Sequence, residues 1–231
     1  MATVIRTARE RARDELTLEI KKEARRQLAE EGAQRLSLRA VARELGMASS
    51  ALYRYFPSRD ELLTALIIDA YNALGERAEQ AVAAGPPDDA RARWHALCDS
   101  VRAWARQHPH EYALLYGTPV PGYAAPAETV APAARVALAL ISVLRSGAGQ
   151  VQLTAPVRPL RGALAEQAAA LVSAVAPEVS AGLLTRGLVA WTQLFGMISF
   201  ELFGHLVGSV DPADEFFAHT VEEMADFLGL P

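Results

Sequence analysis

The stretch from Ser37 to Phe56, SLRAVARELGMASSALYRYF, constrains the fold more than any other part of the chain. Its first half places Leu38, Val41 and further apolar residues at helical spacing, which predicts a helix with one buried face. Gly46 follows where helices commonly end in a left-handed residue, which glycine adopts without steric cost. Residues 49–55 would form a second helix with too little apolar surface to be held by helix propensity alone. We therefore predict two short helices around a tight turn, with DNA as the natural partner of the exposed face.

Charge is distributed unevenly along the chain. The formal net charge of −4 by itself argues against a nucleic-acid partner. Residues 1–60, however, hold 13 Lys and Arg against 9 Asp and Glu, whereas residues 61–231 hold 10 against 18. A basic head on an acidic body is the asymmetry expected when only the head meets phosphates.

Length and cysteine content limit the class of protein. With 231 residues, 51% of them hydrophobic, the chain can bury a core in one large domain or two modest ones. A single cysteine, Cys98, excludes an internal disulfide and fits a reducing compartment. Because no signal peptide is visible either, we predict a cytoplasmic protein. The apolar stretch 183–210 includes Arg186 and Glu201, which favours a buried helix over a membrane span.

Helical periodicity continues through the rest of the chain, and no stretch alternates convincingly like a strand. Capping boxes at Thr7 and Ser58 predict the starts of two long helices, which Gly32 and Gly85 respectively end. We predict an all-α fold of about nine or ten helices, in which a three-helix head precedes a larger helical body. Further helices are expected over 88–107 with Asp88 as cap, 109–116, 128–145, 160–175, 177–207, and 213–228 after a cap at Asp211-Pro212.

Glycines interrupt the longest of these predicted helices. Gly187, Gly196, Gly204 and Gly208 would each cost about 1 kcal/mol relative to alanine inside a helix. Close approach of another helix, at a two-fold interface or from the last helix, would compensate. Because apolar residues lie on both sides of this helix, we predict that it packs inward and also against a second copy, in an isologous dimer.

The segment LSLRAVARELGMASSALYRYFPSRDELL, residues 36–63, resembles the helix-turn-helix of TetR-family transcriptional regulators. The resemblance covers about residues 14–63, and 188–196 with 201–204 are similar, less closely, to the C-terminal domain of one TetR subgroup. It implies a DNA-binding domain over 1–62, an effector-binding and dimerisation domain over 63–231, and a homodimer joined by the last two long helices.

The same resemblance implies which side chains meet DNA. Tyr53 and Tyr55 are expected at phosphates through their hydroxyls, and Arg59 stands where the family usually places a phosphate-binding lysine. Arg54 or Arg39 has the donors to read guanine. Core packing for Tyr53 and a solvated charge for Arg54 remain alternatives. The full predicted set is Ser37, Arg39, Ser49, Ser50, Tyr53, Arg54, Tyr55 and Arg59.

One residue departs from the family pattern. Ala48 occupies the place where the family most often has a capping Ser or Thr, and a missing cap costs about 0.5–2 kcal/mol. If Ser49 replaced it as the cap, the second helix would start one residue later, so the base-reading register stays open.

Aromatic residues of the body are candidates for an effector cavity. They come from separate predicted helices, and a cavity with apolar walls and a few hydroxyls is the usual form of a small-molecule site. A plain core is the alternative. His108 and His110 beside Glu111 are a weak metal signal that helix-start placement explains, so we predict no metal and no cofactor. The predicted lining is Trp94, Cys98, Tyr112, Tyr116, Trp191 and Phe195.

These features predict a sequence-specific DNA-binding regulator, a repressor released from a palindromic operator by a small apolar or amphipathic effector. The two heads would bind sites about 34–36 Å apart. A DNA-independent all-α adaptor is the alternative. An enzyme is disfavoured because the sequence shows no nucleophile–base pair, metal-ligand set or phosphate loop.

Overall fold

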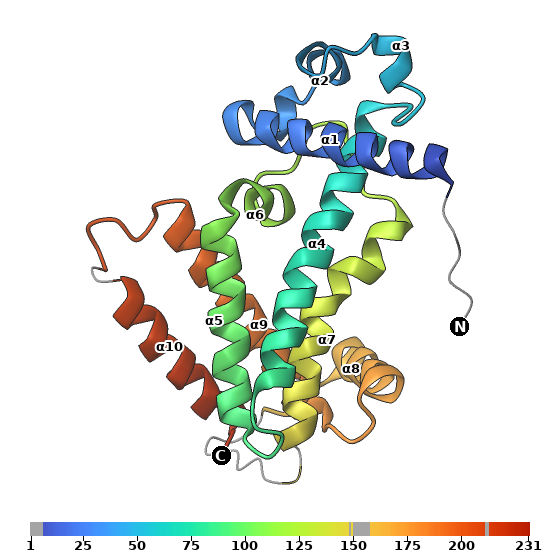
Figure 1. Ribbon diagram of the computed structural model, residues 1–231. Helices are drawn as coiled ribbons and strands as arrows, with labels where there is room; N and C mark the ends of the chain where they lie inside the picture. Colours follow the sequence, from blue (N-terminus) through green and yellow to red (C-terminus); the bar gives the residue numbers. More distant parts are fainter. Residues whose placement is uncertain (1–6, 148, 150–157, 211–212) are drawn as a thin grey trace. The chain divides into compact units, whose positions relative to one another are not determined.

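The computed structural model describes residues 7–147, 149, 158–210 and 213–231. These residues form ten α-helices and two short 3-10 helices without any β-strand, so the predicted all-α fold is confirmed (Figure 1). The chain divides into two compact units. The first unit combines Met1–Ala70 with His110–Val130, and the second unit combines Tyr71–Pro109 with Ala131–Pro231.

The first unit begins with the helix that the capping box predicts. Thr7 Oγ1 accepts a hydrogen bond from the Glu10 amide at 3.2 Å, and the Glu10 carboxylate accepts one from the Thr7 amide at 2.7 Å. This helix, α1, ends before Gly32 as predicted. The elements that supply the first unit are α1 (Ala8–Glu31), η1 (Ala33–Arg35), α2 (Leu38–Glu44), α3 (Ser49–Leu52), the first part of α4 (Arg59–Ala84), most of α6 (Pro109–Tyr116) and η2 (Ala127–Thr129).

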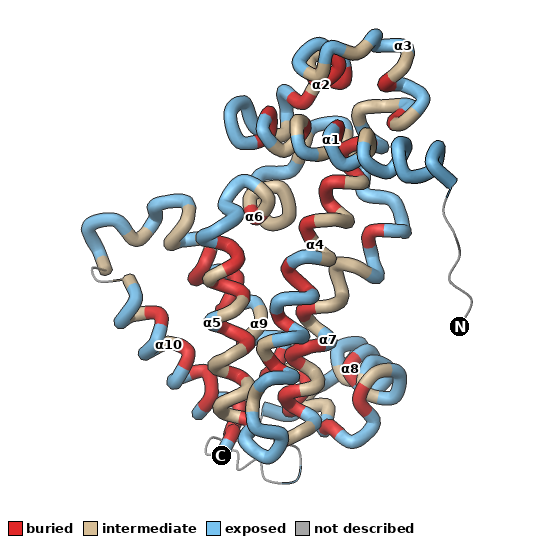
Figure 2. Tube along the Cα trace, viewed as in Figure 1, coloured by how far each residue is buried: buried red, intermediate tan, exposed pale blue. Residues whose placement is uncertain are grey.

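Apolar residues of α1, α2, α3 and α4 form the core of the first unit, and Figure 2 marks the buried positions along these helices in red. The apolar residues along α1 are buried from Ile20 onward, while Leu16 nearer its start is half-buried. Ser58 caps α4 by accepting from the Glu61 amide at 3.1 Å, so the second capping signal also holds. The buried members include Ile20, Ala24, Leu28, Leu38, Val41, Leu52, Leu62, Leu63 and Leu66.

Ion pairs connect α1, α4 and α6 within the first unit. Asp69 of α4 accepts from Lys21 at 2.9 Å and from Arg25 at 2.7 Å, both on α1. Arg25 also donates to Glu111 of α6 at 3.0 Å. One arginine therefore joins three helices, and the predicted boundary between residues 62 and 63 did not anticipate this grouping.

The second unit consists of the rest of α4 and five further helices. Its largest fully buried side chain is Trp94 of α5. The cap of α5 is Asp89, whose carboxylate accepts from the Ala92 amide at 2.8 Å, and not the predicted Asp88. The predicted cap at 211–212 lies outside the described residues. The five helices are α5 (Ala90–Gln107), α7 (Val130–Gly147), α8 (Gly162–Val175), α9 (Ala181–Leu202) and α10 (Ala213–Leu228).

The glycines of α9 differ from the prediction. The helix ends at Leu202, and Gly204 and Gly208 both follow it in turns with φ of 77°. They therefore do not mark close helix packing. Gly187 does, because a Cβ built there would lie 2.6 Å from the Leu144 side chain of α7 in the same chain. Gly196 is exposed, and nothing lies within 4 Å of its Cβ position.

A charged cluster connects α5, α9 and α10. Arg102 is buried, and its guanidinium donates to Glu201 at 2.7 Å and to Asp214 at 2.6 Å. The same guanidinium lies 4.4 Å from the ring centre of Phe217. These hydrogen bonds lower the pKa of Asp214. The cluster therefore holds the start of α10 against the end of α9.

One described segment, Ala127–Gly147, is long and apolar enough to cross a membrane by length and composition. In the structure Val136, Leu140 and Leu144 of this segment are buried, and Arg135 pairs with Glu79 at 2.6 Å. We therefore assign α7 as a core helix of the second unit.

Candidate DNA-binding surface and effector cavity

The turn between α2 and α3 forms as its sequence predicts. Ser37 caps α2, its hydroxyl accepting from the Ala40 amide at 3.4 Å. Gly46 adopts the left-handed conformation with φ of 64°, and the following Met47 amide donates to the Ala42 carbonyl at 2.8 Å. Two helices of fixed relative orientation result, which is the arrangement of a helix-turn-helix.

The second helix starts in the register that places Ala48 at its cap. α3 begins at Ser49, and the Ala48 side chain makes no capping hydrogen bond. Ser49 therefore does not replace it as the cap. The amides at the start of α3 are consequently left for another acceptor, and helix N-termini commonly bind phosphate oxygens.

α3 is shorter than the predicted 49–55 because it buries only one side chain. It ends at Leu52, and residues 53–55 continue as turns in which the Tyr55 and Phe56 amides donate to the Leu52 carbonyl at 2.8 and 3.1 Å. Leu52 and Phe56 are buried and hold this segment to the core. The side chains between these two anchors are therefore fixed at the surface.

Most of the predicted contact residues are exposed. Tyr53 has 41% of its surface exposed, which disfavours core packing for this residue. Arg39 and Arg54 are exposed and have no hydrogen-bond or ion-pair partner among the described residues. Tyr55 is half-buried, and the Arg13 guanidinium of α1 lies 5.8 Å from its ring centre. The remaining members are Ser49 and Ser50, which are exposed, and Ser37 and Arg59, which are half-buried.

Arg59 is engaged inside the first unit. Its guanidinium donates to the backbone carbonyls of Ala33 at 2.8 Å, Gln34 at 3.3 Å and Leu36 at 3.2 Å. It also lies 3.5 Å from Asp60. The phosphate contact that the resemblance implies for Arg59 stays a prediction, and in the structure its hydrogen bonds fix the chain that enters α2.

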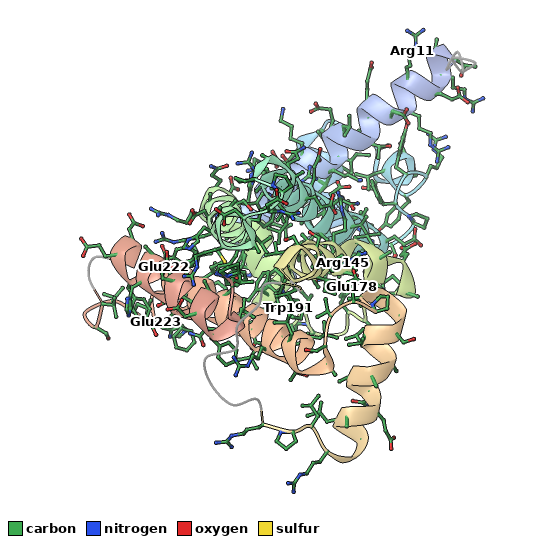
Figure 3. The ribbon with its side chains drawn as sticks, turned by 90° about the horizontal axis from the view of Figure 1, so that it is seen from below. Arg11, Arg145, Glu178, Trp191, Glu222 and Glu223 are labelled. Atoms are coloured by element: carbon green, nitrogen blue, oxygen red, sulfur yellow. The ribbon has the colours of Figure 1, made fainter. Side chains whose placement is uncertain are left out.

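Further cations lie near this surface on α1. Arg9, Arg11 and Arg13 are exposed, and Arg11 extends away from the helix (Figure 3). With Arg39 and Arg54 they give the first unit a set of solvated guanidinium groups. Lysine and arginine side chains of this kind supply the salt-dependent part of DNA binding.

The structure does not gather the six predicted effector residues around one cavity. Tyr112 and Tyr116 belong to the first unit, where their rings lie 5.1 Å apart. Trp94 and Cys98 are buried core residues of the second unit. Burial raises the pKa of the Cys98 thiol, and the nearby charge of Asp99 raises it further.

Trp191 alone of the six lines the apolar cavity between α7, α8 and α9 of the second unit. The Trp94 indole instead donates to the Val221 carbonyl at 2.9 Å. Phe195 is 8% exposed and packs edge-on against Trp191 at 5.8 Å between ring centres. The two indoles thus differ in their surroundings. The Trp94 indole has a backbone carbonyl as its partner in the core, whereas the Trp191 indole packs against an aromatic ring beside the cavity.

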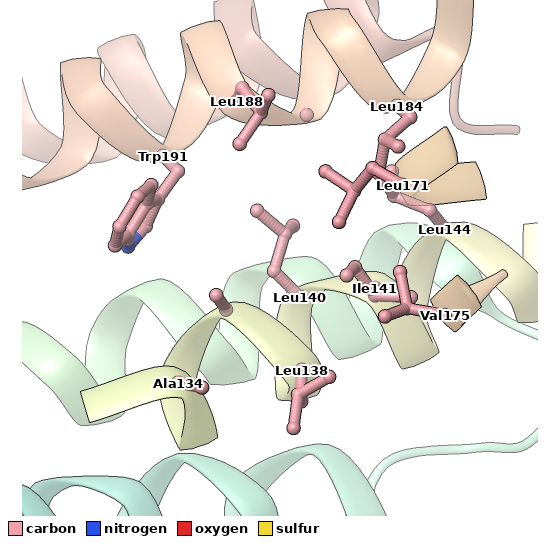
Figure 4. Close-up of a pocket in the computed structure, with 12 residues that line it drawn as sticks. Ala134, Leu138, Leu140, Ile141, Leu144, Leu171, Val175, Leu184, Leu188 and Trp191 are labelled. Atoms are coloured by element: carbon pink, nitrogen blue, oxygen red, sulfur yellow. The ribbon is translucent and has the colours of Figure 1, made fainter. Parts of the chain in front are cut away.

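The cavity lies between α7, α8 and α9 and has a volume of about 190 Å³ (Figure 4). Near it, Arg145 at the end of α7 forms an ion pair with Glu178, which precedes α9 (Figure 3). No side chain that lines the cavity is charged. The lining residues are Ala134, Ala137, Leu138, Leu140, Ile141, Leu144, Leu171, Val175, Leu184, Gly187, Leu188 and Trp191.

Sequence reasoning missed this lining because its pattern does not differ from that of a core. Alanine and leucine at helical spacing on α7 and α9 predict a buried face, but a buried face does not reveal where packing is incomplete. Glu111, one of the weak metal candidates, pairs with Arg25 instead. Among the described residues no group of three His, Cys, Asp or Glu side chains is placed to hold a metal ion.

Family models match both parts of the chain. Residues 20–66 match the model described as bacterial regulatory proteins, tetR family. Residues 94–224 match the model described as tetracyclin repressor-like, C-terminal domain.

Known proteins are similar over nearly the whole chain. The HTH-type transcriptional regulators Mb1846 of Mycobacterium bovis and Rv1816 of Mycobacterium tuberculosis are each 38% identical over 218 residues, which cover 90% of this chain and 91% of theirs. The crystal structure of the putative regulatory protein SCO4313 is 33% identical, with a TM-score of 0.75 over 94% of this chain and 98% of that one. A protein of unknown function from Rhodococcus sp. RHA1 is 25% identical, with a TM-score of 0.69 over 93% and 95%.

Proposed function

The chain belongs to the TetR family of bacterial transcriptional regulators, and from this premise we propose that it is a homodimeric repressor of a pseudo-palindromic operator. In this proposal a small apolar effector, bound in the second unit, releases the protein from DNA. In the same proposal the protein acts in the bacterial cytoplasm. The single observation that carries the proposal is the exposed surface of α3 and the turn after it, where buried anchors hold free polar side chains outward.

The chemistry of that surface supports DNA recognition. The Tyr53 hydroxyl and the Ser49 and Ser50 side chains suit phosphate oxygens, which set the register of the helix on the duplex. Arg54 and Arg39 suit base edges, since a guanidinium can donate twice to guanine in the major groove. Because neither arginine has an intramolecular partner among the described residues, binding DNA breaks no internal ion pair of theirs.

An exposed stripe on α9 supports the homodimer. Its members recur at alternating spacings of four and three, which is the repeat of a helix that packs along a second helix. Val189, Phe200 and Phe203 are 51%, 54% and 43% exposed. Gly196 in the middle of the stripe leaves room for a partner helix to approach closely. The stripe consists of Val189, Gln193, Gly196, Phe200 and Phe203.

The same helix supports regulation by an effector. Leu188 and Trp191 of α9 line the cavity, while Val189 and Gln193 lie on the exposed stripe. A ligand that wedges against one face of α9 therefore acts on the element that also meets the partner copy. Release from DNA requires that the ligand bind the DNA-free arrangement more tightly than the DNA-bound one.

Selection from a random double-stranded DNA library tests the proposal. The selected DNA sequence is expected to be a pseudo-palindrome. The affinity of the protein for this DNA is expected to fall steeply as the salt concentration rises. Arg54→Ala should weaken binding by about 1–3 kcal/mol for one DNA site and reduce sequence preference. Arg77→Ala, which removes an exposed arginine of the second unit, serves as the matched control and should leave affinity unchanged. A wild-type protein with no salt-sensitive, sequence-selective complex would refute the proposal.

A further inference from the structure

One of the residues that line the cavity, Trp191, carries a buried polar side-chain atom. The Nε1 atom of Trp191 is buried and has no hydrogen-bond partner among the residues that the structure describes. Phe195 packs edge-on against the indole ring at 5.8 Å and restricts its orientation. Figure 4 shows the indole reaching from α9 toward α7 at one end of the cavity. A buried donor without an acceptor costs free energy, so its presence calls for a group that accepts its hydrogen.

The lining restricts the chemistry of that group. Apart from Trp191, the described residues that line the cavity are alanine, valine, leucine, isoleucine and glycine, none of which carries a polar side chain. A buried charge would find no counter-ion there, and such burial is strongly unfavourable. A water molecule would also be poorly held, since buried waters typically make about three hydrogen bonds and the lining side chains offer one.

The dimensions restrict its size. A cavity of about 150 Å³ lined by aliphatic and aromatic residues is known to hold benzene, so about 190 Å³ suits a ring with one or two small substituents. Leu138, Leu171 and Leu188 are 48%, 38% and 42% exposed, and each comes from a different helix of the three. Leu140, Leu144 and Leu184 are buried. The lining leucines of the three helices thus include exposed and buried side chains, and the Trp191 indole lies at one end of the cavity.

We propose that this cavity binds an uncharged, mainly hydrocarbon molecule with a single hydrogen-bond acceptor, which receives the hydrogen of the Trp191 indole. The ligand class follows from the lining alone, and only its role as effector rests on the proposed function. Trp191 is then the residue that separates acceptor-bearing ligands from pure hydrocarbons, while the leucines bind both.

Two small molecules of one shape test this assignment. Acetophenone and α-methylstyrene share a skeleton and differ in carrying a carbonyl oxygen or a methylene group. Calorimetric titration into the DNA-free protein gives the Kd of each, and the ratio of the α-methylstyrene Kd to the acetophenone Kd measures the preference for an acceptor. Comparing this ratio between protein variants cancels the different hydration of the two ligands.

Trp191→Phe keeps an aromatic ring and removes the donor. The preference for acetophenone is expected to fall about three- to tenfold in this variant, as the loss of one hydrogen bond predicts. Trp104→Phe makes the same change at a buried tryptophan outside the lining and should leave the preference unchanged. Ala137→Phe places a ring in the cavity and should abolish binding of both ligands. Circular dichroism checks that each variant is folded.

The outcomes separate this inference from the proposed function. An unchanged preference in Trp191→Phe, undiminished binding by Ala137→Phe, or no binding of either ligand at millimolar concentration would overturn the inference. Reduced preference in Trp191→Phe alone supports it, whether or not the protein binds DNA. Adding acetophenone to the selected DNA complex is a separate measurement: release supports the effector role, and an undisturbed complex would contradict that role while leaving the ligand class intact.

Discussion

Replacing Arg59 with alanine is expected to destabilise the protein more than it weakens the electrostatic attraction to DNA. The guanidinium holds three carbonyls of the chain between α1 and α2, the shortest contact being 2.8 Å to Ala33. Hydrogen bonds to a charged group contribute about 1.5–3 kcal/mol in general. Because the Arg59 side chain is 30% exposed, the lower end of that range applies.

This loss translates into a measurable melting shift. For a chain of 150–250 residues, 1 kcal/mol moves Tm by about 2–4 °C, so a loss of about 1.5–2 kcal/mol lowers it by roughly 3–8 °C. Arg59→Lys is the informative comparison, because lysine keeps the charge and lacks the planar fork that reaches separate carbonyls. We expect Arg59→Lys to melt close to Arg59→Ala and well below the wild-type protein.

Thermal melting followed by circular dichroism, and the salt dependence of operator affinity, distinguish the structural role from a phosphate contact. A phosphate contact predicts that Arg59→Ala lowers the slope of log affinity against log salt by about 1 for each head. The structural role predicts a lower Tm with a nearly unchanged slope. If Arg59→Ala has the Tm of the wild-type protein but a smaller slope of log affinity against log salt, the reasoning from these carbonyl contacts is wrong.

Three other substitutions test separate features. Ala48→Ser supplies the missing cap of α3 and should stabilise the protein by about 0.5–1 kcal/mol in urea unfolding, since serine at this position accepts from the free amides; a loss of stability would contradict the observed register. Gly46→Ala forces a side chain into a residue with φ of 64° and should cost about 1–2 kcal/mol in the same assay, and an unchanged midpoint would argue against the left-handed turn. Phe200→Glu places a charge on the exposed stripe of α9 and, if the protein forms the proposed dimer, should convert it to monomer in sedimentation velocity at unchanged helical content; a persisting dimer would exclude this stripe as the interface.

Local signals predicted the elements of the first unit well. The start of α1 depends on Thr7 and Glu10, which lie three residues apart and form the capping box within one turn. The turn at Gly46 likewise depends on backbone conformation that glycine favours. Interactions of this range are visible in the sequence, because both partners lie in the same short segment.

Three features could not be predicted in this way, and two of them depend on distant partners. The end of α9 is one, since the apolar pattern continues beyond Leu202 and only the turn at Gly204 closes the helix. The role of Arg59 is another, because its acceptors are backbone carbonyls 23–26 residues earlier, which carry no sequence signature. The cavity is a third, because incomplete packing depends on three helices at once.

The separation of the first unit into two chain segments limits how this protein can be recombined with relatives. A chimera joined between residues 62 and 63 would pair α1 of one parent with α4 and α6 of another. It would place Arg25 opposite unselected residues at positions 69 and 111, where its guanidinium now lies 2.7 and 3.0 Å from the two carboxylates. An exchange that keeps these partners together takes Met1–Ala70 and His110–Val130 from the same parent and therefore needs three junctions. Transferring DNA specificity between such regulators is thus a problem of moving two segments, and the second one contains no residue predicted to contact DNA.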